Sequence, residues 1–196
     1  MLNVDYCNLS TADRILYAAM QIISEVGLEG LSASKLADTV KISKSSIFHY
    51  YKKMDEIPAL ILKKLYTEII NPIQEGEYEN AHTYLKTLGY ASFSLQPDHI
   101  VIYKAFLSLF QASMYDTRLK EIVMACSEEF DASLYSKLRQ LCKVHVEDIT
   151  IKKFSRLLSM SLDGIVLHYL IHSQTKQAQE AWDVLIDTIV KQFHLE

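Results

Sequence analysis

Apolar residues recur at steps of three and four along most of this 196-residue chain, the spacing that places side chains on one face of an α-helix. The first such stripe contains Ile15, Ala19, Ile22 and Val26, within residues 12–26. Glycine (5) and proline (3) are too scarce for the many turns of a β-sandwich or β-barrel. The sequence therefore predicts an all-α fold with about nine helices.

Capping residues mark the ends of the first three helices. Thr11 is expected to cap the first helix, and Gly27 is expected to end it in a left-handed conformation. Ser32 or Ser34 is expected to cap a short second helix with the sequence ASKLADTV, and Ser43 a short third helix.

Pro58 sets the start of the fourth helix. With Asp55 as the N-cap, Pro58 falls at the third helical position, where its missing N–H costs no hydrogen bond. Asn71-Pro72 is expected to end this helix, and a linker is expected to follow. The later helices are expected at residues 55–70, 79–95, 97–114, 118–143, 148–172 and 177–193, with the linker at 71–78.

The positive charge of the chain is concentrated in one segment. The whole chain has a net charge of −4, which argues against indiscriminate binding to nucleic acid. Residues 32–53 nevertheless carry a net charge of +4, between two acidic segments. The charged residues of this segment are Asp38, Lys35, Lys41, Lys44, Lys52 and Lys53. A local basic patch is what a phosphate-binding surface requires.

Two short helices joined by a tight turn, the second polar on its free face, predict a helix-turn-helix. The second of these helices is expected at residues 44–50, with Ile47 and Tyr51 four apart and facing the core. A helix of this kind fits the major groove of B-DNA, and flanking lysines neutralise the phosphates. Double-stranded DNA is therefore the expected partner.

The N-terminal part of the chain is similar to the DNA-binding half of the TetR family of transcriptional regulators. The resemblance is carried by RILYAAMQIISEVGLEGLSASKLADTV and KISKSSIFHYYKKMDEI, within residues 11–60. Its marks include the Arg-Ile-Leu-x-Ala-Ala start, the aromatic run at 48–51 and the acidic pair at 55–56. Lys41 stands where glycine is common before the recognition helix, so a left-handed backbone is expected at this lysine.

The resemblance implies a helix-turn-helix DNA-binding domain at residues 1–54 and a larger helical ligand-binding and dimerisation domain at residues 55–196. Phosphate contacts, which position the protein, are expected from Ser32, Ser34, Phe48, Tyr50 and Lys53. Contacts to base edges, which specify sequence, are expected from Lys44, Ser45, Ser46 and His49.

The resemblance also implies a homodimer that binds a palindromic operator and is released from it by an unknown small apolar or aromatic effector. Dimerisation through the last two helices is expected to bury Leu158, Leu162, Ile165, Trp182, Leu185 and Ile189. A cavity among the middle helices is expected to be lined by Tyr84, Phe93, Tyr103, Phe106, Phe110, Met114 and Met124. The regulator is expected to be a repressor.

Several alternatives stay open. The aromatic stripe is also compatible with ordinary core packing, and the last two helices with an intramolecular core. An all-helical enzyme or binding protein for a lipid-like or aromatic molecule is one alternative function, and a DNA-binding protein without an effector is another. No nucleophile–base–orienter arrangement is visible at useful spacing, so no enzyme activity is expected.

His168 and His172 lie four residues apart, a spacing that can bind a metal ion. Neither histidine has a Glu three residues before it, so surface or interface histidines are favoured, and no metal or cofactor is expected. The three widely spaced cysteines are typical of buried thiols in a reducing cytoplasm. Without a secretory signal or a run of ~18 apolar residues, the sequence predicts a cytoplasmic protein with no membrane partner.

Overall fold

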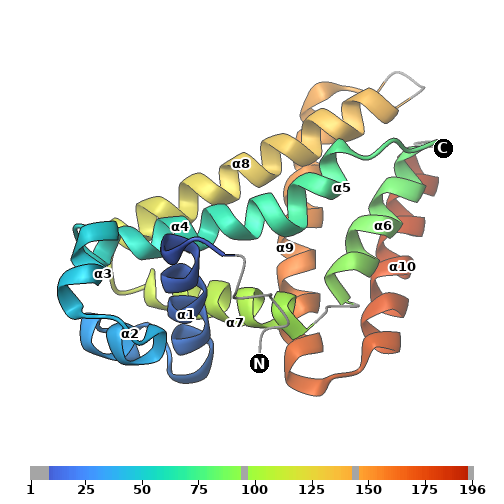
Figure 1. Cartoon of the computed structure of the whole chain (residues 1–196). Coiled ribbons are helices and arrows are strands. Elements are labelled where there is room, and N and C mark those ends of the chain that lie inside the picture. The colour runs from blue at the N-terminus through green and yellow to red at the C-terminus, as the bar shows by residue number, and fades with distance from the viewer. Residues whose placement is uncertain (1–8, 94–96, 143–145, 194–196) are drawn as a thin grey trace. The chain divides into compact units, whose positions relative to one another are not determined.

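All regular elements among the described residues of the chain are helical. The computed structural model describes residues 9–93, 97–142 and 146–193. The α-helices are α1 (Thr11–Val26), α2 (Ala33–Val40), α3 (Lys44–Tyr50), α4 (Ile57–Leu65), α5 (Asn71–Glu75), α6 (Ala81–Phe93), α7 (Pro97–Ala112), α8 (Thr117–Leu141), α9 (Asp148–His172) and α10 (Thr175–Phe193) (Figure 1). The expected all-α class is confirmed.

The chain folds into two compact units. Unit 1 contains Met1–Thr67 and Gln96–Met124, and unit 2 contains Glu68–Leu95 and Ala125–Glu196. Each unit therefore combines segments that are distant in the sequence. The expected boundary between residues 54 and 55 was drawn from expected function, and it stays a prediction.

A serine begins each of the first three helices. The Oγ atoms of Ser10, Ser32 and Ser43 each accept the backbone N–H three residues later, at 3.1, 3.2 and 3.1 Å respectively. Ser10 is therefore the N-cap of α1, which corrects the expectation for Thr11. Of the two candidate serines before α2, Ser32 is the N-cap.

A lysine whose backbone is in the left-handed helical conformation makes the tight turn between α2 and α3. Lys41 has φ 59° and ψ 47°, as the sequence predicted. The N–H groups of Lys41 and Ile42 both donate to the Ala37 carbonyl oxygen, at 3.0 Å for Ile42. Gly27 after α1 also has a positive φ of 77°, but its ψ of 174° is extended, so the expected left-handed cap at that position is wrong.

The fourth helix continues further than expected. Pro58 is the second residue of α4, in the first turn, where a proline costs little. A π-helical segment, Tyr66–Ile70, then runs directly into α5. The expected end of the helix at Pro72 is therefore wrong. Residues 71–75 of the expected linker at 71–78 are helical as well. Proline has no backbone N–H to donate to the helix. A π turn shifts the hydrogen-bond register by one residue, and such a shift lets the helix continue past the proline.

The later helices begin and end within a few residues of the expected positions. The continuous helical stretch of α4 and α5 counts as one element, so the expected number of about nine helices also agrees for the described residues. Residues 94–95 and 143, which end two of the expected helices, lie outside the described residues.

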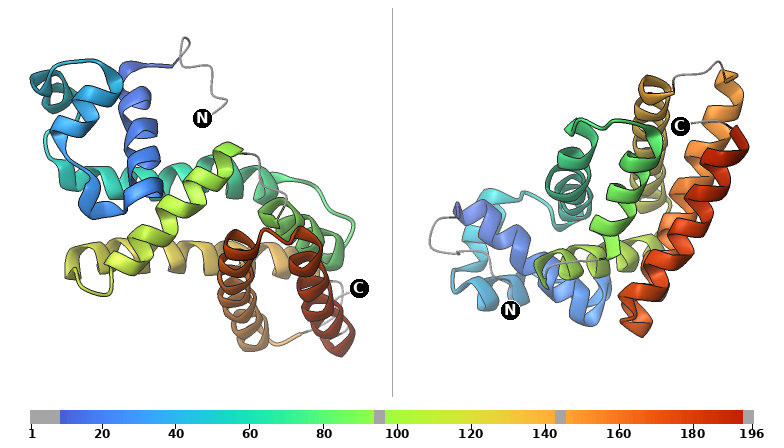
Figure 2. Two further views of the ribbon diagram at one scale, coloured as in Figure 1. Left: turned by 90° about the horizontal axis from the view of Figure 1, so that it is seen from below. Right: turned by 90° about the vertical axis from the view of Figure 1, so that its right-hand side faces the viewer.

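Unit 2 is built around Trp182. α10 packs against both α6 and α9, and α9 and α10 are adjacent antiparallel helices joined by a short turn (Figure 2). The indole Nε1 donates to the Leu85 carbonyl oxygen at 2.8 Å. Phe93 packs edge-on against the indole, with ring centroids 6.2 Å apart. Gly89 permits this approach, because a Cβ atom there would overlap the indole nitrogen.

Candidate nucleic-acid interface

One side of α3 is held against the core of unit 1. Ile47 is fully buried, and Tyr51, directly after the helix, is 8% exposed. The Tyr51 hydroxyl donates to the Ala12 carbonyl oxygen of α1 at 2.7 Å. Burial raises the pKa of Tyr51, and the negative charge of Asp13 raises it further, so the hydroxyl keeps its proton. This anchoring decides which residues of α3 reach solvent.

The residues expected nearest the bases lie on the free side of α3. Lys44, Ser45 and His49 are exposed, and Ser46 is half-buried. The Oγ of Ser43 lies 2.7 Å from the Oγ of Ser45 and 2.8 Å from the Oγ of Ser46. The start of α3 therefore presents a cluster of hydroxyl groups that both donate and accept hydrogen bonds, which suits base edges and phosphates alike.

Two aromatic rings near the end of α3 remain exposed. Phe48 is 46% exposed and Tyr50 is 44% exposed. The rings of His49 and Tyr50 meet edge to face, with centroids 5.3 Å apart. Neighbouring aromatic side chains left open to water on a short helix are typical of a surface that meets a partner.

The lysines of residues 32–53 are not buried. All five are exposed, as is Asp38, the acidic residue of the same segment. Ser32, the N-cap of α2, is exposed, and Ser34 within α2 is half-buried; α2 packs against α3 (Figure 1). The structure thus leaves every expected DNA-contacting side chain at least partly accessible. Their contacts with DNA stay a prediction.

The residues expected to line an effector cavity divide between the two units. Tyr84 and Phe93 are fully buried in unit 2, where the Tyr84 hydroxyl donates to Oε1 of Gln74 at 3.0 Å and burial raises the Tyr84 pKa. The other five belong to unit 1; they are Tyr103 (buried), Phe106 (half-buried) and the exposed Phe110, Met114 and Met124. Neither of the two pockets described below contains any of the seven, and their common cavity stays a prediction.

Most of the expected dimerisation residues pack inside unit 2. Ile165 and Leu185 are half-buried. The other four are at most 4% exposed: Leu158, Leu162, Trp182 and Ile189. These four are core residues and are not available to a second copy of the chain, which corrects that expectation.

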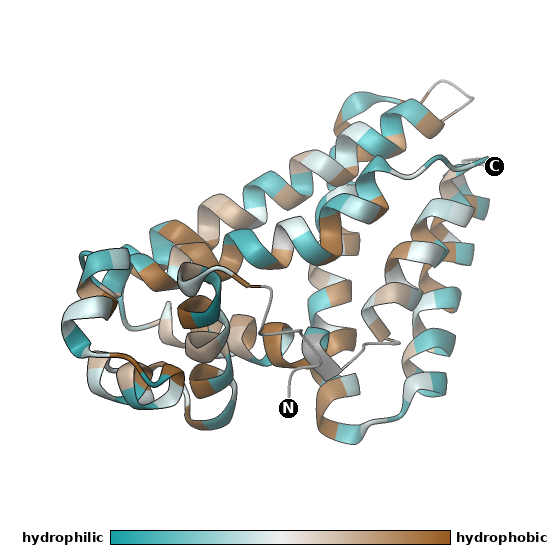
Figure 3. Cartoon of the chain, viewed as in Figure 1, coloured by the Kyte–Doolittle hydropathy of each residue, from teal (hydrophilic) through white to brown (hydrophobic). Residues whose placement is uncertain are grey.

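A different apolar stripe on the same two helices is exposed, and the sequence analysis missed it. On α9 it contains Leu157, Met160, Gly164, Leu167 and Ile171, at alternating steps of three and four; on α10 it contains Ala181 and Val184. Its large apolar side chains are between 43% and 68% exposed. Apolar bands accordingly alternate with polar bands along α9 (Figure 3). By length and composition alone, α9 is also the one helix among the described residues apolar enough to cross a membrane.

His168 and His172 lie beside this stripe. Their rings stack with centroids 5.8 Å apart and planes inclined by 20°. Both line a pocket of about 250 Å³ between α9 and α10, together with Gly164, Ile165, Tyr169, Gln174, Gln177, Ala178 and Ala181. No group of three or more His, Cys, Asp or Glu residues in the described part of the chain is placed to hold a metal ion.

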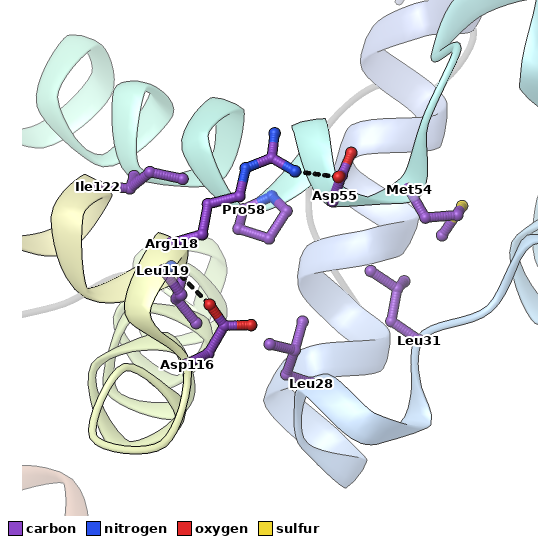
Figure 4. A pocket seen from close by; sticks show the side chains of 9 residues that line it. All are labelled: Leu28, Leu31, Met54, Asp55, Pro58, Asp116, Arg118, Leu119 and Ile122. Atoms are coloured by element: carbon purple, nitrogen blue, oxygen red, sulfur yellow. Dashed lines mark hydrogen bonds and ion pairs between the residues drawn. The ribbon is translucent and has the colours of Figure 1, made fainter.

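A further pocket, of about 230 Å³, lies in unit 1 among residues that the sequence analysis did not assign to any site (Figure 4). Its lining side chains are Leu28, Leu31, Met54, Asp55, Pro58, Asp116, Arg118, Leu119 and Ile122. Arg118 forms an ion pair with Asp55, 63 residues away in the sequence. No local sequence pattern marks a pair of this kind.

The comparisons with known proteins agree with this geometry. The profile of the family described as bacterial regulatory proteins, tetR family, matches residues 15–59, which span α1 to the start of α4. An HTH-type transcriptional regulator BetI from Vibrio vulnificus (strain YJ016) is 24% identical over 186 residues, covering 91% of this chain and 90% of that protein.

Solved structures of similar fold cover nearly the whole chain. A transcriptional regulator from Rhodococcus sp. Rha1 superimposes with a TM-score of 0.79 at 18% identity, covering 94% of this chain and 98% of that one. The transcriptional regulator FadR from Bacillus subtilis, in complex with stearoyl-CoA, superimposes with a TM-score of 0.69 at 17% identity, covering 91% and 97%.

Proposed function

Because the chain is a TetR-family transcriptional regulator, we propose that it represses transcription from a palindromic operator and is released by a small apolar or aromatic effector. The observation that carries the proposal is the division of α3 into two sides. Ile47 and Tyr51 are fixed inward, so the hydroxyl, lysine and aromatic side chains of the same helix face solvent together.

α3 is the proposed recognition helix in the major groove. Its first residues and His49 reach the base edges, as the N-terminal part of a recognition helix does. The base-contacting residues are Lys44, Ser45, Ser46 and His49, and the phosphate-contacting residues are Ser32, Ser34, Phe48, Tyr50 and Lys53. The exposed lysines supply most of the affinity by releasing counterions from the DNA.

Two copies of the chain pair through the exposed stripe of α9 and α10. Alternating steps of three and four are the spacing at which one helix packs along another. Gly164 lies within the stripe, and a Cβ atom there would meet nothing within 4 Å, so its own unit has no need of a glycine. Close approach of a helix from a second copy gives this residue a role. Pairing also removes large exposed apolar side chains from water.

A twofold-symmetric dimer is the reason why we propose a palindromic operator. α3 has seven residues, and a single helix of that length contacts too few bases for tight binding. Two copies of α3 related by a twofold axis read two inverted half-sites, about 34–36 Å apart when the half-sites are one helical turn apart.

The effector binds among the middle helices. The Bacillus FadR structure, with its stearoyl-CoA ligand, supports a ligand cavity in a protein of this fold. In this chain the seven aromatic and methionine side chains named above are the proposed lining. Effector binding favours a conformation in which the two copies of α3 no longer match adjacent major grooves. We place the protein in the cytoplasm with the operator and assign it no enzymatic step.

Binding to DNA from the region upstream of the protein's own gene tests the proposal. Fluorescence anisotropy on a palindromic fragment is expected to show binding that weakens as salt rises. The double variant Lys44→Ala, Tyr50→Ala is expected to bind at least about tenfold more weakly.

A matched variant separates the recognition helix from general effects. Lys120→Ala with Tyr115→Ala removes one exposed lysine and one exposed tyrosine from α8 and the turn before it. This variant is expected to bind as the parent does. Equal binding by both double variants, with unchanged far-UV circular dichroism, would show that α3 is not the recognition helix.

A further inference from the structure

The pocket of unit 1 has walls that are mainly apolar. Three segments form it: residues 28–31 after α1, residues 54–58 with the 3-10 turn Met54–Glu56, and residues 116–122 at the start of α8 (Figure 4). Its apolar side chains are Leu28, Leu31, Met54, Pro58, Leu119 and Ile122. The volume of about 230 Å³ is below the ~300 Å³ at which pockets for drug-sized ligands begin, so an occupant is compact.

The charged groups of the pocket do not balance. Arg118 is paired with Asp55. The Oδ1 atom of Asp116 accepts the N–H of Leu119 at 2.9 Å and so caps α8. Its second carboxylate oxygen points toward the middle of the pocket, on the side of Leu28 (Figure 4). Two carboxylates and one guanidinium give the lining a net charge of −1, and the surplus lies at Asp116.

We propose that this pocket binds a compact organic cation. Its apolar body packs on the six apolar side chains, and its ammonium group meets the free oxygen of Asp116 in a charge-assisted hydrogen bond. An anionic ligand would be repelled by Asp116, and Arg118 is already paired with Asp55. A neutral ligand of the same shape would cover the carboxylate without replacing the water that solvates it.

The site is separate from the proposed effector cavity. None of its lining residues is among the seven aromatic and methionine side chains assigned to that cavity. It lies instead against Met54 and Asp55, in the short segment that leads from α3 to α4. The proposal therefore does not depend on where the effector binds or on whether the protein represses transcription.

Methyl NMR of the full chain tests the site with 2-phenylethylammonium as the probe. Saturable shifts are expected at the methyl groups of Met54 and Ile122, while the methyl groups of Ile186, in the core of unit 2, stay in place. Two probes of similar size, the neutral 2-phenylethanol and the anionic 3-phenylpropanoate, are expected to bind about fivefold more weakly or worse.

A pair of variants on α8 isolates the charge. Asp116→Asn keeps an oxygen to cap Leu119 but removes the carboxylate, and it is expected to weaken probe binding about fivefold. Glu121→Gln removes an exposed charge from the same helix outside the pocket, and affinity is expected to stay unchanged. The proposal is overturned if Met54 and Ile122 show no saturable shift, if alcohol and ammonium bind equally, or if the two variants bind alike.

Discussion

The indole nitrogen of Trp182 reaches the backbone carbonyl of Leu85, at 2.8 Å, through a space that exists only because residue 89 is glycine. Gly89→Ala is expected to lower the free energy of unfolding by about 2 to 4 kcal/mol. The added methyl group overpacks the contact of α6 with α10, and displacing the indole leaves a buried donor without its acceptor. Urea denaturation measures the change. Thr87→Ala, on the exposed side of α6, serves as the control and is expected to stay within about 0.5 kcal/mol of the parent.

The contrast between α3 and Trp182 shows what a sequence can predict here. The bounds of α3, its Ser43 cap and the left-handed Lys41 are decided by residues within one turn of each other, and all three agree with the structure. The neighbours of Trp182 lie far away in the sequence, so no local pattern reveals them. The same holds for the ion pair of Arg118 with Asp55 and for the pocket around it.

The last two helices show a second limit of sequence patterns. α9 carries two apolar stripes with the same helical steps, one through Leu158 and Leu162 and the other through Leu157 and Met160. Spacing alone does not tell which stripe faces the core. Packing against α6 and α10 buries the first and leaves the second in solvent, so spacing alone led the sequence analysis to assign core residues to an interface.

Met160→Glu is expected to convert the proposed dimer into a monomer. Met160 is 65% exposed in the single chain, so the substitution disturbs little of its own unit but places a charge in the seam between copies. Sedimentation equilibrium measures the mass. Ile149→Glu makes the same kind of change on α9, at a residue 55% exposed but outside the stripe, and it is expected to leave the dimer intact. A parent protein that sediments as a monomer would remove the dimer from the proposal.

Lys41→Gly is expected to stabilise the protein by about 0.5 to 1 kcal/mol. The left-handed conformation at φ 59° strains a residue that has a Cβ atom, and glycine adopts it without that strain. Thermal unfolding without DNA measures the gain. Lys35→Gly provides the comparison, because the same substitution within α2 is expected to destabilise by about 1 kcal/mol. A loss of stability in both variants would contradict the strain at Lys41.

Asp163 is expected to take up a proton near neutral pH. Although Asp163 as a whole residue is exposed, partial desolvation of its carboxyl group, and secondly the negative charge of Asp131, raise its pKa from 3.8 to about 6. Between these two values the folded protein holds more protons than the unfolded chain, so this group makes folding more favourable as pH falls from 7 toward 4. Carbon-13 NMR of the side-chain carboxyl is expected to give a midpoint near 6, and a lower midpoint in Asp131→Asn. In Asp163→Asn this pH-dependent gain in stability is expected to disappear, and a parent midpoint close to 4 would contradict the assignment.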